Sequence, residues 1–119
     1  MENFQYRGLV CVRINDEANV NVPHKHKHHS PTGLEWGYGG SGPADLALNV
    51  LALMMPCFGD DIEANAVKLA DGSTVSREAW ALHQQFKWDF LATMPHEGGM
   101  IPIDSIRAWC AVQVAGLEQ

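Results

Sequence analysis

The chain has 119 residues, of which 46% are hydrophobic and 18% charged, and its formal net charge is −6. This composition excludes an intrinsically disordered chain and suffices for a single domain over residues 1–119 with one hydrophobic core. The negative charge argues against direct DNA or RNA binding, because proteins that coat nucleic acids present a basic surface.

Cysteine usage and the apolar runs indicate where the protein resides. Cys11, Cys57 and Cys110 are odd in number, lack metal-like spacing and sit in apolar settings, so we expect buried, reduced thiols. The N-terminal sequence lacks the basic opening and the long apolar stretch of a signal peptide. The longest apolar run, 50–58, is interrupted by Pro56 and is far shorter than the roughly 20 residues that span a bilayer. We therefore expect a soluble, cytoplasmic protein with no membrane partner.

The first predicted element is a β-hairpin. Branched side chains recur at every second position over 9–14, a polar turn follows at 15–17, and the alternation resumes over 20–22. A period of two is typical of strands, so we predict two strands and an end of the hairpin at Pro23. A third extended segment can follow over 24–29.

Three helices are predicted after the hairpin. The first spans about 43–55 and is apolar over most of its circumference, which predicts a central position in the fold. The second begins after the capping residue Ser76 and ends before Pro95. A connection that opens at Gly98-Gly99 leads to the third, which ends at Gly116.

Strands precede helices, so the predicted fold class is α+β, an N-terminal small antiparallel β-sheet followed by about three α-helices. The polar connection 59–73 between the first two helices can hold a short helix over 62–69, and Asp71-Gly72 is typical of a turn.

The segment 30–42 is rich in glycine and runs directly into the first helix. Gly39, Gly40 and Gly42 remove side chains where the backbone turns tightly or where another group approaches closely. The helix start that follows has unpaired N–H groups that can hold an anion. Two interpretations stay open: packing of neighbouring aromatic side chains beneath the helix start, or contact with a ligand. Ser41 is not expected to be a nucleophile, because Pro43 stands where a G-x-S-x-G elbow requires glycine.

The segment 24–29 reads His-Lys-His-Lys-His-His. On a strand, His24, His26 and His28 would share one face, where three imidazoles could ligate zinc. The same residues could instead form a basic lip that faces an anionic ligand, or an ordinary exposed edge strand. We expect no structural metal site here, because no acidic residue nearby is evident that could accept a hydrogen bond from a metal-bound imidazole.

Aromatic and cationic side chains mark the last two helices. Phe86 and Lys87 could stack a base and neutralise a phosphate, or Phe86 could belong to the core. Trp88 lies on another helix face and is predicted to mark an interface or a ligand wall. Arg107 is the lone cation of the third helix, and it could pair with an acid such as Glu35 or hold a ligand phosphate.

A resemblance to known proteins rests on these same segments. The string SPTGLEWGYGGSGPADLALNVL, residues 30–51, resembles the signature of a family of small phage, plasmid and bacterial proteins, and residues 6–8, residues 85–87 and the Trp109 helix fit the same pattern. The layout of a sheet followed by helices is similar to that of the phage Thoeris anti-defence sponges. Those proteins are not enzymes; they sequester the cyclised ADP-ribose signal of the Thoeris immune system, and some hold cyclic oligonucleotides in symmetric oligomers.

The resemblance implies a non-enzymatic homo-oligomer that sequesters a cyclic nucleotide and needs no cofactor or metal. In this interpretation Phe86 stacks a base and Arg107 holds a phosphate, in a pocket that also includes Gly39, Gly40, Ser41, Gly42, Lys87 and His28. Four tryptophans and an apolar central helix also predict an oligomer. Two alternatives remain: a protein-interaction module of a mobile element, acting through Trp88 and the histidine edge, and a zinc-dependent hydrolase built on the histidines.

Overall fold

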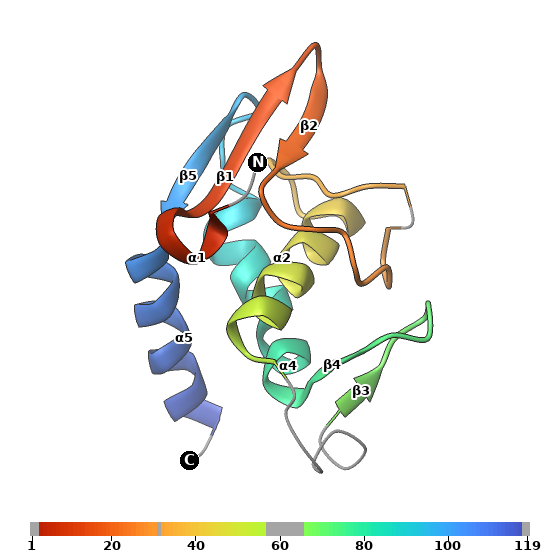
Figure 1. Cartoon of the computed structure of the whole chain (residues 1–119), viewed down its shortest axis with the longest axis vertical. Coiled ribbons are helices and arrows are strands. Elements are labelled where there is room, and N and C mark those ends of the chain that lie inside the picture. Colours follow the sequence, from red (N-terminus) through yellow and green to blue (C-terminus); the bar gives the residue numbers. More distant parts are fainter. Residues whose placement is uncertain (1–2, 31, 57–65, 118–119) are drawn as a thin grey trace.

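The protein is described here by a computed structural model that covers residues 3–30, 32–56 and 66–117 (Figure 1). A three-stranded antiparallel sheet lies at one end of the molecule, and the helices extend from it toward the other end (Figure 1). A second, two-stranded sheet lies beside the helices. The predicted α+β class is confirmed.

The predicted β-hairpin opens the larger sheet. β1 (Gly8–Ile14) pairs with β2 (Glu17–Val20), and a short helix α1 (Phe4–Arg7) precedes them. The turn residues Asn15 and Asp16 have φ values of 52° and 66°. Asn and Asp tolerate this left-handed conformation better than most residues, which explains the sharp reversal.

The third strand of this sheet comes from the C-terminal half of the chain. β5 (Gly98–Pro102) pairs with the free edge of β1, so the strand order is β2-β1-β5. The predicted connection at Gly98-Gly99 is therefore wrong, because these residues begin a strand. Gly98 has a φ of 116°, and a Cβ at this position would overlap the Cys11 carbonyl. Only glycine fits this close approach of two backbones.

Helix α2 (Ser41–Met54) is the central helix, as predicted. All ten residues over 42–51 are buried, and the helix packs against α4 (Arg77–Phe86) and the π-helical turn η2 (Lys87–Leu91) that continues it. The Ser76 hydroxyl accepts a hydrogen bond of 3.1 Å from the Ala79 N–H, which confirms the predicted cap.

The remaining elements are β3 (Ala66–Lys68), β4 (Thr74–Ser76) and α5 (Ile103–Leu117). β3 and β4 form a hairpin whose turn contains Gly72, with a φ of 87°. β3 occupies the end of the short helix predicted over 62–69, which is wrong there; the part of that prediction before residue 66 lies outside the described residues.

Two of the three cysteines lie in the described part of the chain. Cys11 and Cys110 are buried free thiols, as predicted, and burial raises the pKa of Cys11 to about 12. Cys57 lies outside the described residues. None of the described helices is long and apolar enough to cross a membrane.

Candidate functional site

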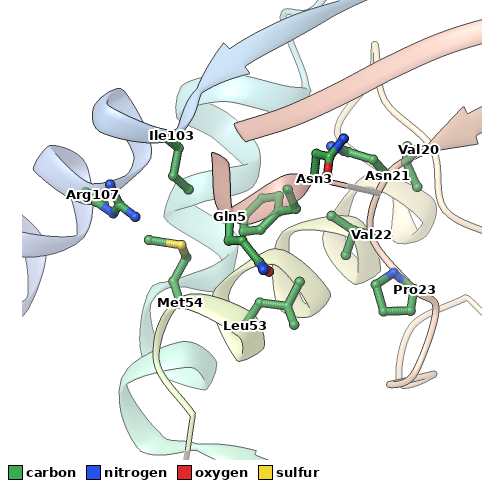
Figure 2. A pocket seen from close by; sticks show the side chains of 11 residues that line it. Asn3, Gln5, Val20, Asn21, Val22, Pro23, Leu53, Met54, Ile103 and Arg107 are labelled. Carbon is green, nitrogen blue, oxygen red and sulfur yellow. The ribbon is translucent and has the colours of Figure 1, made fainter. Parts of the chain in front are cut away.

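A cavity of about 860 Å³ opens between α1, the segment that follows β2, the end of α2 and the start of α5 (Figure 2). It is lined by one guanidinium, three amide side chains and seven apolar residues. These are Arg107; Asn3, Gln5 and Asn21; and Phe4, Val20, Val22, Pro23, Leu53, Met54 and Ile103. In Figure 2 Arg107 lies at one end, Asn3 and Asn21 at the other, and Gln5 between them.

The guanidinium of Arg107 is available to a ligand. Its side chain is 59% exposed, and its Nη1 lies 3.4 Å from Oδ1 of Asp104, an exposed carboxylate one helical turn away. A solvent-exposed pair of this kind contributes little stability, so an anion can replace it at small cost. The alternative pairing with Glu35 is wrong, because Glu35 Oε1 instead lies 2.7 Å from Nη2 of Arg13.

The three amides have different roles. Asn21 is structural: its Oδ1 accepts from the Val10 N–H at 2.8 Å, and its Nδ2 donates to the Gly8 carbonyl at 2.8 Å. These bonds fix the segment after β2 against β1. The side chains of Asn3 and Gln5 make no hydrogen bond to another described residue, so their donors and acceptors are open. No short motif joins these residues to Arg107, and sequence reasoning missed them.

A second cavity of about 250 Å³ adjoins the first. Its lining includes Pro23 and Leu53, which also line the larger cavity, so the two lie on either side of these residues. Lys25, His26 and Asn49 contribute its polar lining, and Lys25 adds a second cation to the two adjoining cavities.

Phe86 does not reach either cavity. Its side chain is 0% exposed, and its ring packs against Phe90 and Trp109 with centroid distances of 4.9 and 5.2 Å. The predicted stacking of a base on Phe86 is therefore wrong in this structure, because the ring already has aromatic neighbours and no free face. The alternative assignment of Phe86 to the core is confirmed.

The glycine loop, residues 39–42, leaves room for neighbouring side chains to pack against its backbone. A Cβ at Gly39 would overlap the Trp88 ring, one at Gly40 would overlap the Tyr38 ring, and one at Gly42 would crowd the Glu35 side chain. Neither cavity described above is lined by this loop or by Ser41, which begins α2. The expectation that the loop and Arg107 share one pocket is therefore wrong.

Lys87 contacts the glycine loop but lines neither cavity described above, so its predicted place in one pocket with Arg107 is wrong. Its buried ammonium donates to the Gly39 carbonyl at 3.2 Å and lies 4.5 Å from the centroid of the Trp88 ring. The contact holds the loop against η2. Trp88 itself is 56% exposed, as predicted for a residue outside the core face.

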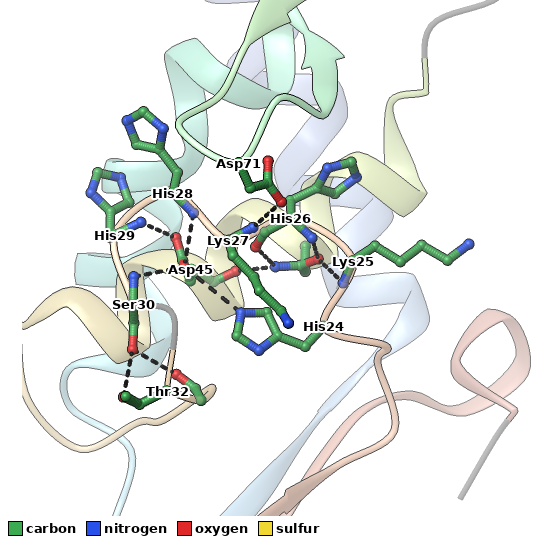
Figure 3. Close-up of polar contacts among 12 residues, drawn as sticks. His24, Lys25, His26, Lys27, His28, His29, Ser30, Thr32, Asp45 and Asp71 are labelled. Atoms are coloured by element: carbon green, nitrogen blue, oxygen red, sulfur yellow. Dashed lines mark hydrogen bonds and ion pairs between the residues drawn. The ribbon is translucent and has the colours of Figure 1, made fainter.

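The histidine segment, residues 24–29, is not a strand. Asp45 of α2, with 0% exposure, accepts hydrogen bonds from the N–H groups of His28, His29 and Ser30 at 2.8–3.2 Å (Figure 3). Asn49, one turn later, accepts from the N–H groups at 25 and 26. The predicted edge strand is wrong because these side chains take the backbone donors that a strand would use. A polar pair spaced four residues apart in an apolar helix was the available signal.

The imidazoles of this segment contact different neighbours. His28 Nδ1 accepts from the Ala70 N–H at 2.8 Å, His26 Nδ1 lies 2.9 Å from Ser73 Oγ, and His29 Nε2 lies 3.0 Å from His83 Nε2. His28 therefore faces the β3–β4 hairpin, and the predicted role of this side chain in a ligand-facing lip is wrong. Over residues 3–30, 32–56 and 66–117, no group of three or more His, Cys, Asp or Glu side chains has the arrangement of a metal site.

Comparison with known proteins identifies the family. A family model described as "Family of unknown function (DUF6166)" matches residues 5–70, more than half of the chain, and the chain therefore belongs to this family. The match includes most of the cavity wall but not Arg107. No curated protein and no solved structure matches the chain significantly.

Proposed function

We propose that this member of the DUF6166 family is a phage-type anti-defence protein of the host cytosol. It binds a cyclic nucleotide immune signal, of the cyclic ADP-ribose type or a cyclic oligonucleotide, and sequesters it without turnover. The observation that carries the proposal is the cavity that an available guanidinium shares with the open amides of Asn3 and Gln5 (Figure 2).

The chemistry of the lining suits a nucleotide. Arg107 can bind a phosphate through two parallel N–H donors, which is the preferred geometry of guanidinium with an oxyanion. Asn3 and Gln5 offer amides of the kind that pair with the donor and acceptor edge of adenine. Apolar side chains such as Val22, Leu53 and Met54 supply the surface against which a base or ribose packs.

The size of the larger cavity also suits a nucleotide. The cavity volume of about 860 Å³ lies within the range of roughly 300–1,000 Å³ that is typical of small-molecule sites. The adjoining cavity with Lys25 offers a second cation, so a ligand with two phosphates could contact both cavities.

The lining of the larger cavity suits binding rather than catalysis. A guanidinium stays protonated in proteins, and amides neither take up protons near neutral pH nor act as nucleophiles. None of the described residues that line the larger cavity is a Ser, Cys, His, Lys, Asp or Glu. Sequestration then follows from mass action, and tight binding at high copy number suffices.

Retention of intact ligand tests the proposal. The purified protein is mixed with cyclic ADP-ribose isomers and cyclic dinucleotides, washed, heated, and the released compound identified by mass spectrometry. We expect one class to be released unchanged, and Arg107→Gln to lose retention while Lys68→Gln, a matched loss of an exposed cation on β3, keeps it. Release of a cleaved product would contradict sequestration, and equal retention by Arg107→Gln would contradict the site.

We also propose that the protein is a homo-oligomer. Val10 pairs with Met100 across the sheet, so Met100 and Ile14 lie on the same sheet face, and both side chains are exposed. An exposed apolar sheet face is typical of an association surface. Light scattering at micromolar concentration should give a mass above the 13.1 kDa of the monomer.

A second candidate function is a protein-interaction module. Trp88 and Tyr38 both expose their rings beside the glycine loop, where Gly39 and Gly40 let them pack against the backbone. Aromatic residues of this kind frequently anchor protein interfaces. In this case Trp88→Ala should abolish capture of a host protein, and Arg107→Gln should not change it.

A further inference from the structure

The β3–β4 hairpin is tied to the histidine segment through its tip, residues 70–73. Figure 3 shows Asp71 of this tip beside the segment. The Ala70 N–H donates to His28 Nδ1 at 2.8 Å, and the Lys27 N–H donates to Asp71 Oδ2 at 3.0 Å. His26 Nδ1 and Ser73 Oγ lie 2.9 Å apart. The flanking residues Leu69 and Val75 are buried, so the hairpin is anchored at its base independently of its tip.

The positions of the protons in these contacts follow from the partners. An amide nitrogen can only donate, so His28 Nδ1 must carry a lone pair and no proton. The Ser73 hydroxyl donates its single proton to Asp71 Oδ1 at 2.6 Å, so its contact with His26 requires a proton on Nδ1 of that imidazole. A second proton on the His26 ring would bind to Nε2 and leave the contact with Ser73 intact. A proton on His28 Nδ1 would instead place its N–H directly against the N–H of Ala70.

The charged and titratable groups around His28 come from every element packed against it. They are Lys27 and His29 of the same segment, Asp45 of α2, His83 of α4 and Asp71 of the hairpin tip, and Lys87 of η2 acts on the adjacent His29. Hydrogen bonds from Ser73 and the Lys27 N–H lower the pKa of Asp71 to about 2, so its carboxylate stays ionised on mild acidification. Burial lowers the pKa values of His29 and His83, so these rings resist protonation.

We propose that His28 is a proton-operated latch whose protonation at Nδ1 releases the tip of the β3–β4 hairpin from the histidine segment. Protonation turns the Nδ1 acceptor into a donor, so the bond from the Ala70 N–H is lost when the His28 ring becomes charged. His26 also lines the second cavity, and loss of the tip would loosen this part of its wall. The latch does not depend on the proposed nucleotide function.

Residue-specific hydrogen exchange tests the latch, with rates corrected for the intrinsic effect of pH. The Ala70 amide reports directly, because it makes the bond that protonation breaks. We expect its protection to fall about 3- to 10-fold from pH 7.5 to pH 5.5, as for the loss of one hydrogen bond. Amides of α2 such as Leu51 should keep their protection. Unchanged protection of Ala70, or an equal loss throughout α2, would overturn the proposal.

A substitution that places a permanent acceptor near the same atom separates the latch from other pH effects. The carbonyl oxygen of His28→Asn can replace Nδ1 and cannot be protonated, so Ala70 should stay protected at both pH values. His24→Asn, whose side chain has no bond to the hairpin, should respond as the unaltered protein does. In NMR spectra of the unaltered protein, the chemical shifts of the Ala70 amide and of the His28 ring nitrogens should change with pH together, with one midpoint. Different midpoints, or pH-dependent release in His28→Asn, would refute the latch.

Discussion

Substitution of Asp45 by asparagine should destabilise the protein strongly. Oδ2 of this buried carboxylate accepts from the N–H groups of His28 and Ser30 at 3.2 and 2.8 Å, and Oδ1 accepts from that of His29 at 2.9 Å. An asparagine keeps one acceptor oxygen and turns an N–H donor toward at least one of these backbone donors. Hydrogen bonds to a charged group contribute about 1.5–3 kcal/mol each, and an unpaired buried donor costs about 1–3 kcal/mol. We expect a loss of about 3 kcal/mol, a large part of the 5–15 kcal/mol of a typical domain.

Urea denaturation measures this loss, because the four tryptophans report unfolding by fluorescence. The midpoint should fall while the slope stays the same, since the surface exposed on unfolding is unchanged. Asp104→Asn is the matched control, because that carboxylate is exposed and makes only a weak contact with Arg107. A midpoint for Asp45→Asn equal to that of the control would refute the stabilising role of this carboxylate.

Three further predictions concern stability. Phe86→Ala should cost about 3–5 kcal/mol in urea denaturation, because it leaves a cavity among packed aromatic rings; a loss below 1 kcal/mol would place the ring outside the core. Burial lowers the pKa of His83 in the folded state, so the folded protein favours the neutral ring. The stability that the neutral ring contributes is full above the unfolded pKa of about 6.5 and is lost as the pH falls through the folded pKa. Urea midpoints at pH 7.5 and 5.5 should therefore differ less in His83→Gln than in the unaltered protein. Arg107→Gln should leave the thermal midpoint of the ligand-free protein unchanged in calorimetry, and a clear drop would indicate a structural ion pair.

Local patterns in the sequence were sufficient for much of the fold. The alternation over 9–14, the cap at Ser76 and the apolar circumference of 43–55 each depend on near neighbours, and each predicted its element correctly. β5 escaped prediction because Gly98 and Gly99 resemble a connection, and only pairing with β1, far away in the chain, makes them a strand.

The candidate site was harder to predict, because its walls come from separate parts of the chain. Asn3 and Gln5 line one cavity with Arg107 only through the packing of α1 against α5, which no spacing reveals. Helical periodicity placed Phe86 on an apolar face but could not tell a buried ring from one that stacks a ligand. A strand was one open interpretation of the histidine segment, because the acceptors that exclude it lie on another element, α2.

The central claim, that the Arg107 cavity binds a cyclic nucleotide, is tested most directly by mapping a titration on the backbone amides by NMR. Cyclic ADP-ribose isomers and cyclic dinucleotides would be added in turn to the labelled protein. We expect one class to shift the signals of Gln5, Val22, Met54 and Arg107 together, with no change in the ligand's own spectrum over time. Shifts confined to Tyr38 and Trp88, or no shifts with any of these compounds, would contradict it.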